Sequence, residues 1–184
     1  MVVGSPHSQE IPQWFAMRVT YKRELAVKDL LDAQGVESFI PMHKVVRQLR
    51  GRKKWSLEPV VHNLLFVHAC KSWLQQFKVK LPHLQYMTQR SDGKNHPIVV
   101  RDEEMQRFME VTRTYDEQLL FFKTEELDLA KGTKVRIHGG PFDGVEGTFM
   151  KVKGKRNRRV VIAIQNVIAV AMAYVEPDFI EVIK

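Results

Sequence analysis

The sequence predicts an α+β protein, with an N-terminal α/β sandwich, in which helices cover an antiparallel sheet, and a small C-terminal β-barrel. Two observations predict this architecture. Strand-like and helix-like runs alternate in the first part of the chain, whereas the last part is β-like throughout. A polar, acidic stretch separates the two. We therefore expect domains at residues 11–115 and 131–184, joined by a linker at 116–130.

The first elements follow from residue type and spacing. The aromatic and β-branched run Gln13–Thr20 predicts a strand, and Glu24–Gln34, with apolar residues at helical spacing, predicts a helix. A second strand is expected at Val36–Val46, with an edge or a bulge at Pro41, because proline cannot donate to a sheet. The apolar run Val60–Ala69 predicts the central strand of the sheet.

Two further helices complete the N-terminal half. One begins with Ser72 as its N-cap, and the other with Asp102. Strands are expected between them at 85–88 and 98–100, separated by a turn at Asp92-Gly93. The resulting order, βαββαβ followed by a helix, is the split βαβ arrangement of a small α/β sandwich.

In the C-terminal half, the segment Lys131–Lys153 predicts its backbone conformation most clearly. Val135 and Ile137 alternate with polar residues, and a glycine- and proline-rich reversal at 139–144 precedes a second alternating run, which predicts a β-hairpin. A barrel of about five strands hides its edges and suits this composition. The remaining strands are expected at Val160–Ile164, Val167–Val175 and Phe179–Ile183.

Composition narrows the class of protein. The chain has 184 residues and a formal net charge of +8, which favours a polyanionic partner, nucleic acid first. Its single cysteine, Cys70, excludes an intramolecular disulfide and fits a reducing compartment. The apolar run 160–175 is interrupted by polar residues and is shorter than the ~20 residues that span a bilayer. We expect a cytoplasmic monomer that does not bind membranes.

One basic run is the strongest candidate for binding a polyanion. Its six cations lie within eleven residues that contain no carboxylate, and Gly51 marks the expected tip of a hairpin. Such a projecting hairpin suits phosphate neutralisation, although a solvated loop is the simpler interpretation. Trp55 at its base suits either stacking on a base or packing. The predicted nucleic-acid-binding residues are Lys44, Arg47, Arg50, Arg52, Lys53 and Lys54.

The sequence offers no constellation for catalysis or for a metal. Seven histidines occur without an HExxH motif or a Cys-His cluster, and Cys70 has no evident base. Gly139-Gly140-Pro141 lacks the Lys-Ser/Thr of a phosphate loop. We expect no enzymatic activity, no cofactor and no metal.

Both halves resemble the NusG family of transcription factors, over about residues 14–183. The C-terminal hairpin resembles the KOW motif through Lys131-Gly132, Gly140-Pro141-Phe142 and Gly144–Gly147. This resemblance implies a KOW domain, which is an SH3-like five-stranded barrel. The first half resembles the NusG N-terminal (NGN) domain through Trp14-Phe15, Phe39-Ile40-Pro41 and Pro59–Val67. Together with the basic loop and the segment Pro97–Met105, these stretches most resemble the UpxY-type paralogues of capsular polysaccharide operons.

This resemblance implies an elongation and antitermination factor that rides on RNA polymerase and promotes readthrough of one operon, touching exposed DNA or nascent RNA as it does so. In the family the NGN domain docks on the clamp helices of the polymerase. The residues expected to form the apolar docking surface are Trp14, Phe15, Phe39, Pro41, Leu64 and Phe66. The competing functions are a general nucleic-acid-binding or ribosome-associated KOW protein without polymerase contact, and a nuclease.

Two departures from the family pattern matter. His62-Asn63-Leu64 replaces the common Pro-Gly-Tyr, and Val145 replaces a second phenylalanine of the KOW loop. We therefore expect weaker binding to the ribosomal protein and to the termination factor Rho, the partners that the resemblance implies for this domain. Phe142 either contacts a partner or plugs the end of the barrel. The residues expected to contact a KOW partner are Phe142, Val145, Lys151, Lys153, Arg156 and Arg158.

Overall fold

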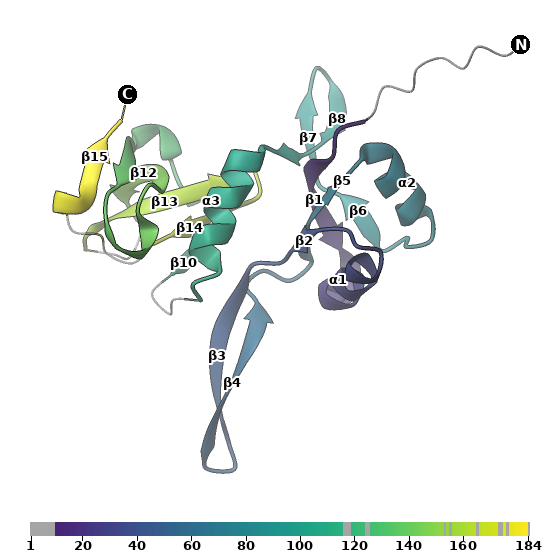
Figure 1. The fold of residues 1–184 in the computed structure, drawn as a ribbon, viewed down its shortest axis with the longest axis horizontal. Coiled ribbons are helices and arrows are strands. Elements are labelled where there is room, and N and C mark those ends of the chain that lie inside the picture. The colour runs from purple at the N-terminus through teal and green to yellow at the C-terminus, as the bar shows by residue number, and fades with distance from the viewer. Residues whose placement is uncertain are drawn as a thin grey trace, which may run out of the picture. The chain divides into compact units, whose positions relative to one another are not determined.

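The computed structural model describes residues 10–115, 119–123, 126–152, 154, 156–164, 166–172, 175 and 177–183 (Figure 1). The chain divides into two compact units. The first unit comprises Met1–Phe39 and Asn63–Val99, and the second comprises Ile40–His62 and Val100–Lys184. The mixed α+β architecture expected from the sequence is confirmed, since helices and antiparallel sheets both occur.

The sheet of the first unit is antiparallel and runs in the order β2-β5-β1-β6, with β9 also pairing with β1. Four consecutive residues are buried in each of the interior strands β1 and β5, so both faces of the sheet are covered. Its strands are β1 (Gln13–Val19), β2 (Ser38–Phe39), β5 (Leu64–Ala69), β6 (Leu84–Tyr86) and β9 (Val99–Val100).

Two helices belong to this first unit. α1 (Glu24–Ala33) packs on β2 and β5, and it buries Val27 and Leu31, which lie four residues apart on one face. It ends where Gly35 takes a positive φ of 68°, as expected for a glycine that closes a helix. α2 (Lys71–Val79) begins one residue before the predicted cap. Ser72 therefore lies in the first turn, where its N–H donates to the carboxylate of Glu10 at 3.1 Å.

The remaining short elements differ from the expectation at one point. The turn at Asp92-Gly93 joins a hairpin of β7 (Thr88–Ser91) and β8 (Lys94–Pro97), and this hairpin was not expected between the strands predicted at 85–88 and 98–100. The 3-10 turns of both units are η1 (Thr20–Lys22), η3 (Leu129–Lys131), η4 (Gly140–Phe142) and η5 (Pro177–Phe179).

The C-terminal strands form one antiparallel sheet in the second unit, in the order β10-β14-β13-β12-β11-β15. Among the described residues this sheet has six strands and not about five, because β10 joins its edge from within the predicted linker. Leu120 and Phe122 of β10 pack against the core around Val161 and Ala171, which explains the pairing. The strands are β10 (Leu120–Phe122), β11 (Thr133–Ile137), β12 (Glu146–Lys151), β13 (Arg158–Ile164), β14 (Ile168–Ala171) and β15 (Ile180–Val182).

The helix α3 (Asp102–Thr112) packs against β13 within the second unit. Its cap is Arg101 and not Asp102, which instead opens the first turn, where carboxylates favour the helix dipole. Its apolar face is buried through Met105, Phe108 and Met109. Packing thus groups α3 with the C-terminal strands.

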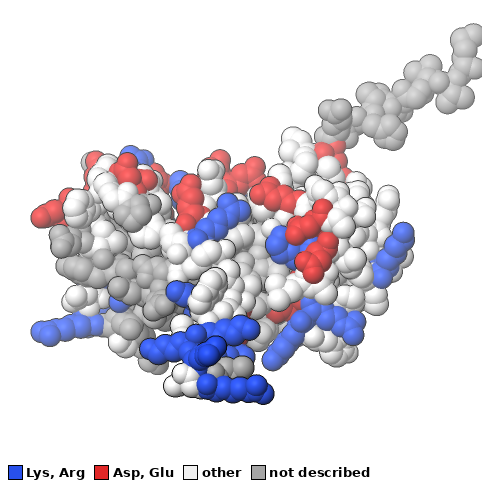
Figure 2. All heavy atoms as spheres, turned by 60° about the horizontal axis from the view of Figure 1, so that its bottom comes forward, with Lys and Arg blue, Asp and Glu red and all other residues white. Residues whose placement is uncertain are grey.

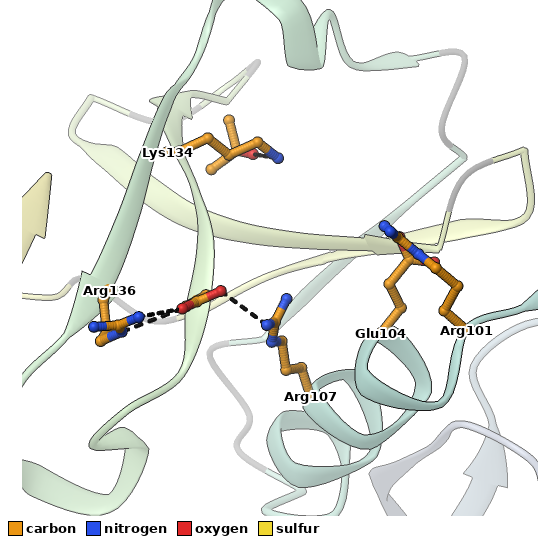
Figure 3. A network of polar contacts seen from close by, with 7 residues as sticks. Arg101, Glu104, Arg107, Lys134 and Arg136 are labelled. Atoms are coloured by element: carbon orange, nitrogen blue, oxygen red, sulfur yellow. Dashed lines mark hydrogen bonds and ion pairs between the residues drawn. The ribbon is translucent and has the colours of Figure 1, made fainter. Parts of the chain in front are cut away.

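A carboxylate on β12 connects this helix to the sheet. Glu146 accepts hydrogen bonds from the Arg136 guanidinium, at 2.6 Å for Nη2, and forms an ion pair with Arg107 of α3 at 2.8 Å (Figure 3). The hydrogen bond from Arg136, aided by the charges of Arg107 and Lys134, lowers the pKa of Glu146 below its usual value near 4.5.

Gly147 lies where β12 and β13 approach each other closely. A Cβ atom at this position would lie 2.6 Å from Val160 Cγ1 and 2.9 Å from the Val161 carbonyl oxygen. Because the second neighbour is backbone, the strands themselves would have to separate to admit a methyl group.

Gly147→Ala is therefore expected to destabilise the protein by about 1–3 kcal/mol, the usual cost of overpacking. Urea denaturation of the full chain measures this difference. Thr133→Ala, at an exposed position of the neighbouring strand β11, is the matched control and should cost about 0.5 kcal/mol or less. Equal stability of the two variants would contradict the close approach.

The lowered pKa of Glu146 predicts a pH dependence. A carboxylate whose folded-state pKa is lowered stabilises the fold above its unfolded pKa, and this contribution is lost as the pH falls through the folded pKa. The difference in melting temperature between the wild-type protein and Glu146→Gln should thus be constant near neutral pH and shrink below about pH 4.5. A difference that grows on acidification would contradict this assignment.

Candidate nucleic-acid interface

The basic run lies on a β-hairpin of the second unit. Its strands β3 (Met42–Leu49) and β4 (Arg52–Pro59) pair antiparallel along their whole length (Figure 1). At the tip, Arg50 and Gly51 both have positive φ, of 47° and 77°. Two such residues form the type I′ turn that matches the twist of paired strands. The tip predicted at Gly51 is confirmed.

Pro41 explains why this hairpin is separate from the sheet. The strand expected at Val36–Val46 is interrupted at Ile40 and Pro41, with β2 before the interruption and β3 after it. In the described structure β3 and β4 form a two-stranded sheet of their own. The Pro41 carbonyl accepts from the Val60 N–H at 2.9 Å, and this bond closes the base of the hairpin.

All six predicted basic residues are exposed on this hairpin. Residues opposite each other in an antiparallel pair share a face, so the register assigns each cation to a side. The aromatic face carries Lys44, Val46, Lys53, Trp55 and Leu57. The carboxylate face carries His43, Arg47, Arg52, Lys54 and Glu58, while Arg50 lies in the turn.

The hairpin carries far more positive than negative charge. The sequence 42–59 contains six Lys or Arg and a single carboxylate, Glu58. That carboxylate accepts from Arg47 at 2.8 Å and from the Ser56 hydroxyl at 3.1 Å, so it balances the charge of Arg47. The excess of positive charge therefore lies toward the tip, and Figure 2 shows Lys and Arg side chains gathered where the lower part of Figure 1 comes forward.

This arrangement can neutralise phosphate groups. Lys and Arg side chains on a narrow, exposed ribbon can contact a nucleic-acid backbone from both sides, and each contact releases counterions. Sequence reasoning missed Val46 and Leu57 as partners of Trp55. The pairing register about Gly51 is the signal that would have placed them on one face.

The residues expected to form a polymerase-docking surface are placed differently from the expectation. All six, Trp14, Phe15, Phe39, Pro41, Leu64 and Phe66, are buried. Trp14 stacks on His68 with ring centroids 5.0 Å apart, and Phe15 packs against Tyr86 at 5.4 Å. These side chains lie in the core because β1 and β5 are interior strands covered on both faces.

The residues expected to contact a KOW partner divide into three groups. Val145 is 5% exposed, so its side chain offers no contact surface, and its backbone forms hydrogen bonds with Ile137 and Phe142. Phe142 is half-buried. The exposed cations are Lys151, Arg156 and Arg158, and Lys153 lies outside the described residues.

Two properties of the described residues bear on other classes of function. They contain no group of three or more His, Cys, Asp or Glu side chains that could hold a metal ion. No helix in the same part of the chain is long and apolar enough to cross a membrane.

Comparison with known proteins identifies the class. A family model described as "Transcription termination factor nusG" matches residues 12–109, more than half of the chain. No curated protein matches. A solved structure concerned with domain interaction in Thermotoga maritima NusG is 20% identical, covers 94% of this chain and 98% of that chain, and has a TM-score of 0.44.

The basic hairpin and the mixed fold thus lie in a protein of the transcription machinery. The chain belongs to the NusG family. Members of this family are non-enzymatic transcription factors that interact with RNA polymerase.

Proposed function

We propose that the chain is a transcription elongation and antitermination factor that binds RNA polymerase through an N-terminal domain of residues 11–115. The observation that carries this proposal is the family match over residues 12–109, which falls entirely within that domain. The clamp helices of the polymerase are the proposed docking site. The factor acts in the cytoplasm as a monomer and promotes readthrough of one operon, as the UpxY-type resemblance suggests for polysaccharide synthesis.

Because the aromatic residues of the N-terminal sheet are buried, this proposal gives them a structural role and not a role in contacting the polymerase. Trp14, Phe15 and Phe66 hold the N-terminal sheet together and shape the domain that docks. The contact itself then comes from exposed side chains around that core.

The proposal assigns the hairpin to nucleic acid at the transcription complex. Its tip carries the excess of positive charge, and exposed DNA or nascent RNA is the polyanion nearest to a polymerase-bound factor. The same charges also support the competing function, a general nucleic-acid-binding KOW protein without polymerase contact. Recovery of the polymerase after nuclease treatment separates the two.

The C-terminal domain, residues 131–184, serves in this proposal as a recruitment module beyond a linker at 116–130. Half-buried Phe142 and the exposed cations Lys151, Arg156 and Arg158 are its proposed contacts. Because Val145 is a core residue, binding to the ribosomal protein or to Rho is weaker than for proteins with a second exposed aromatic at this site.

The tagged full chain should recover RNA polymerase from its own cells, and this recovery should survive nuclease treatment of the lysate. A direct protein contact is insensitive to nuclease, whereas a bridge of DNA or RNA is destroyed. Immunoblotting of the polymerase subunits measures the recovery. Polymerase that is recovered only from untreated lysate would favour the competing function.

Replacing Arg50, Arg52 and Lys53 by alanine should flatten the slope of log affinity against log salt by about two units. Each phosphate contact on a single strand contributes roughly 0.7 to that slope. Fluorescence anisotropy of a labelled oligonucleotide measures the effect. Alanine at Lys71, Lys80 and Lys94, which are exposed outside the hairpin, removes the same charge as a matched control and should leave the slope unchanged.

A further inference from the structure

The aromatic face of the hairpin presents apolar side chains to solvent. Val46 and Trp55 lie directly opposite each other, and Leu57 follows on the same side of β4. Their exposed fractions are 52%, 62% and 38%. Neighbouring apolar side chains with this much exposure mark an interaction surface more often than a feature of folding.

Folding of the hairpin does not account for Trp55. A cross-strand pair with Val46 contributes only modestly, and a β-branched residue at position 55 would supply it as well. An indole that is 62% exposed leaves most of its apolar area in water. The large ring is therefore better explained by something that covers it.

Two lysines border the ring on the same face. Lys44 Nζ lies 5.7 Å from the centroid of the Trp55 ring, and Lys53 precedes Trp55 by two residues on its strand. No carboxylate lies on this face, because Glu58 is on the opposite side with Arg47. A ligand that covers the ring must therefore combine a flat apolar surface with negative charge for the lysines on this face.

A single strand of nucleic acid has both properties. Each unpaired base offers a π-face of the size of the indole, and phosphates flank it along the backbone. A duplex offers phosphates, but its base faces are stacked inside the helix. We propose that the aromatic face binds a single strand, with one base stacked on Trp55 and the adjoining phosphates held by Lys44 and Lys53.

This inference rests on the proposed role of the hairpin and specifies the state of the nucleic acid that it recognises. It also divides the affinity into two parts. Stacking on Trp55 depends little on salt, whereas the contacts of Lys44 and Lys53 weaken as salt rises.

Two substitutions at one position test the stacking. Trp55→Phe keeps an aromatic ring, while Trp55→Val keeps the β-branched pair with Val46 and removes the ring, so both maintain the hairpin. Affinity of the full chain is measured by fluorescence anisotropy with labelled 15-nucleotide oligo(dT), oligo(rU) and a matching duplex. The DNA and RNA arms show which strand is preferred.

Trp55→Phe should bind the preferred single strand within about threefold of the wild-type protein. Trp55→Val should lose roughly 5- to 140-fold, since stacking contributes about 1–3 kcal/mol per base, with an unchanged salt slope. Duplex affinity should not change in either variant. Val79→Ala, at a residue 83% exposed at the end of α2, is the control and should bind as the wild-type protein does.

Wild-type affinity of Trp55→Val for both single strands would overturn the inference, as would equal losses in both Trp55 variants. So would unchanged oligonucleotide binding with reduced nuclease-resistant recovery of polymerase, which would make the aromatic face a protein contact. If wild-type protein recovers no polymerase while Trp55→Val still loses single-strand affinity, the proposed function fails and this inference stands.

Discussion

The pairing of β5 with its two neighbours is the constraint on which the structure depends. β5 pairs with β1 through residues far apart in sequence and with β2 through the pair Phe39↔Phe66. The chain between β2 and β5 contains the basic hairpin, whose strands pair along their whole length. The bond from the Val60 N–H to the Pro41 carbonyl, at 2.9 Å, closes the base of this hairpin.

This arrangement separates residues that stabilise the fold from residues that are free to bind. Trp14 is 4% exposed and stacks on His68, whereas Trp55 is 62% exposed beside a lysine. Burial of a large aromatic side chain contributes about 1.5–3 kcal/mol, which Trp14 supplies and Trp55 largely does not. Residue type alone did not distinguish the two roles, because the difference lies in the strands that surround each ring.

Local signals in the sequence predicted local features well. The helical spacing of Val27 and Leu31 and the glycine at position 51 act through the backbone of their own segments, and the structure has α1 and the hairpin tip there. Features that depend on distant partners were not predicted. Phe15 is buried because of β5 and β6, and β10 forms because β14 offers an edge to an apolar stretch in a polar region.

The placement of helix α3 in the second unit is likewise a feature that its own sequence did not predict. Its sequence continues the N-terminal half, and most of it lies within the family match, yet it packs against β13 in the second unit. Two kinds of interaction are available there. The partly exposed ion pair of Arg107 with Glu146 contributes about 1 kcal/mol, whereas each large apolar side chain that α3 buries contributes about 1.5–3 kcal/mol. Burial of the apolar face therefore decides the placement of α3, and the Glu146 network adds orientation and a dependence on pH.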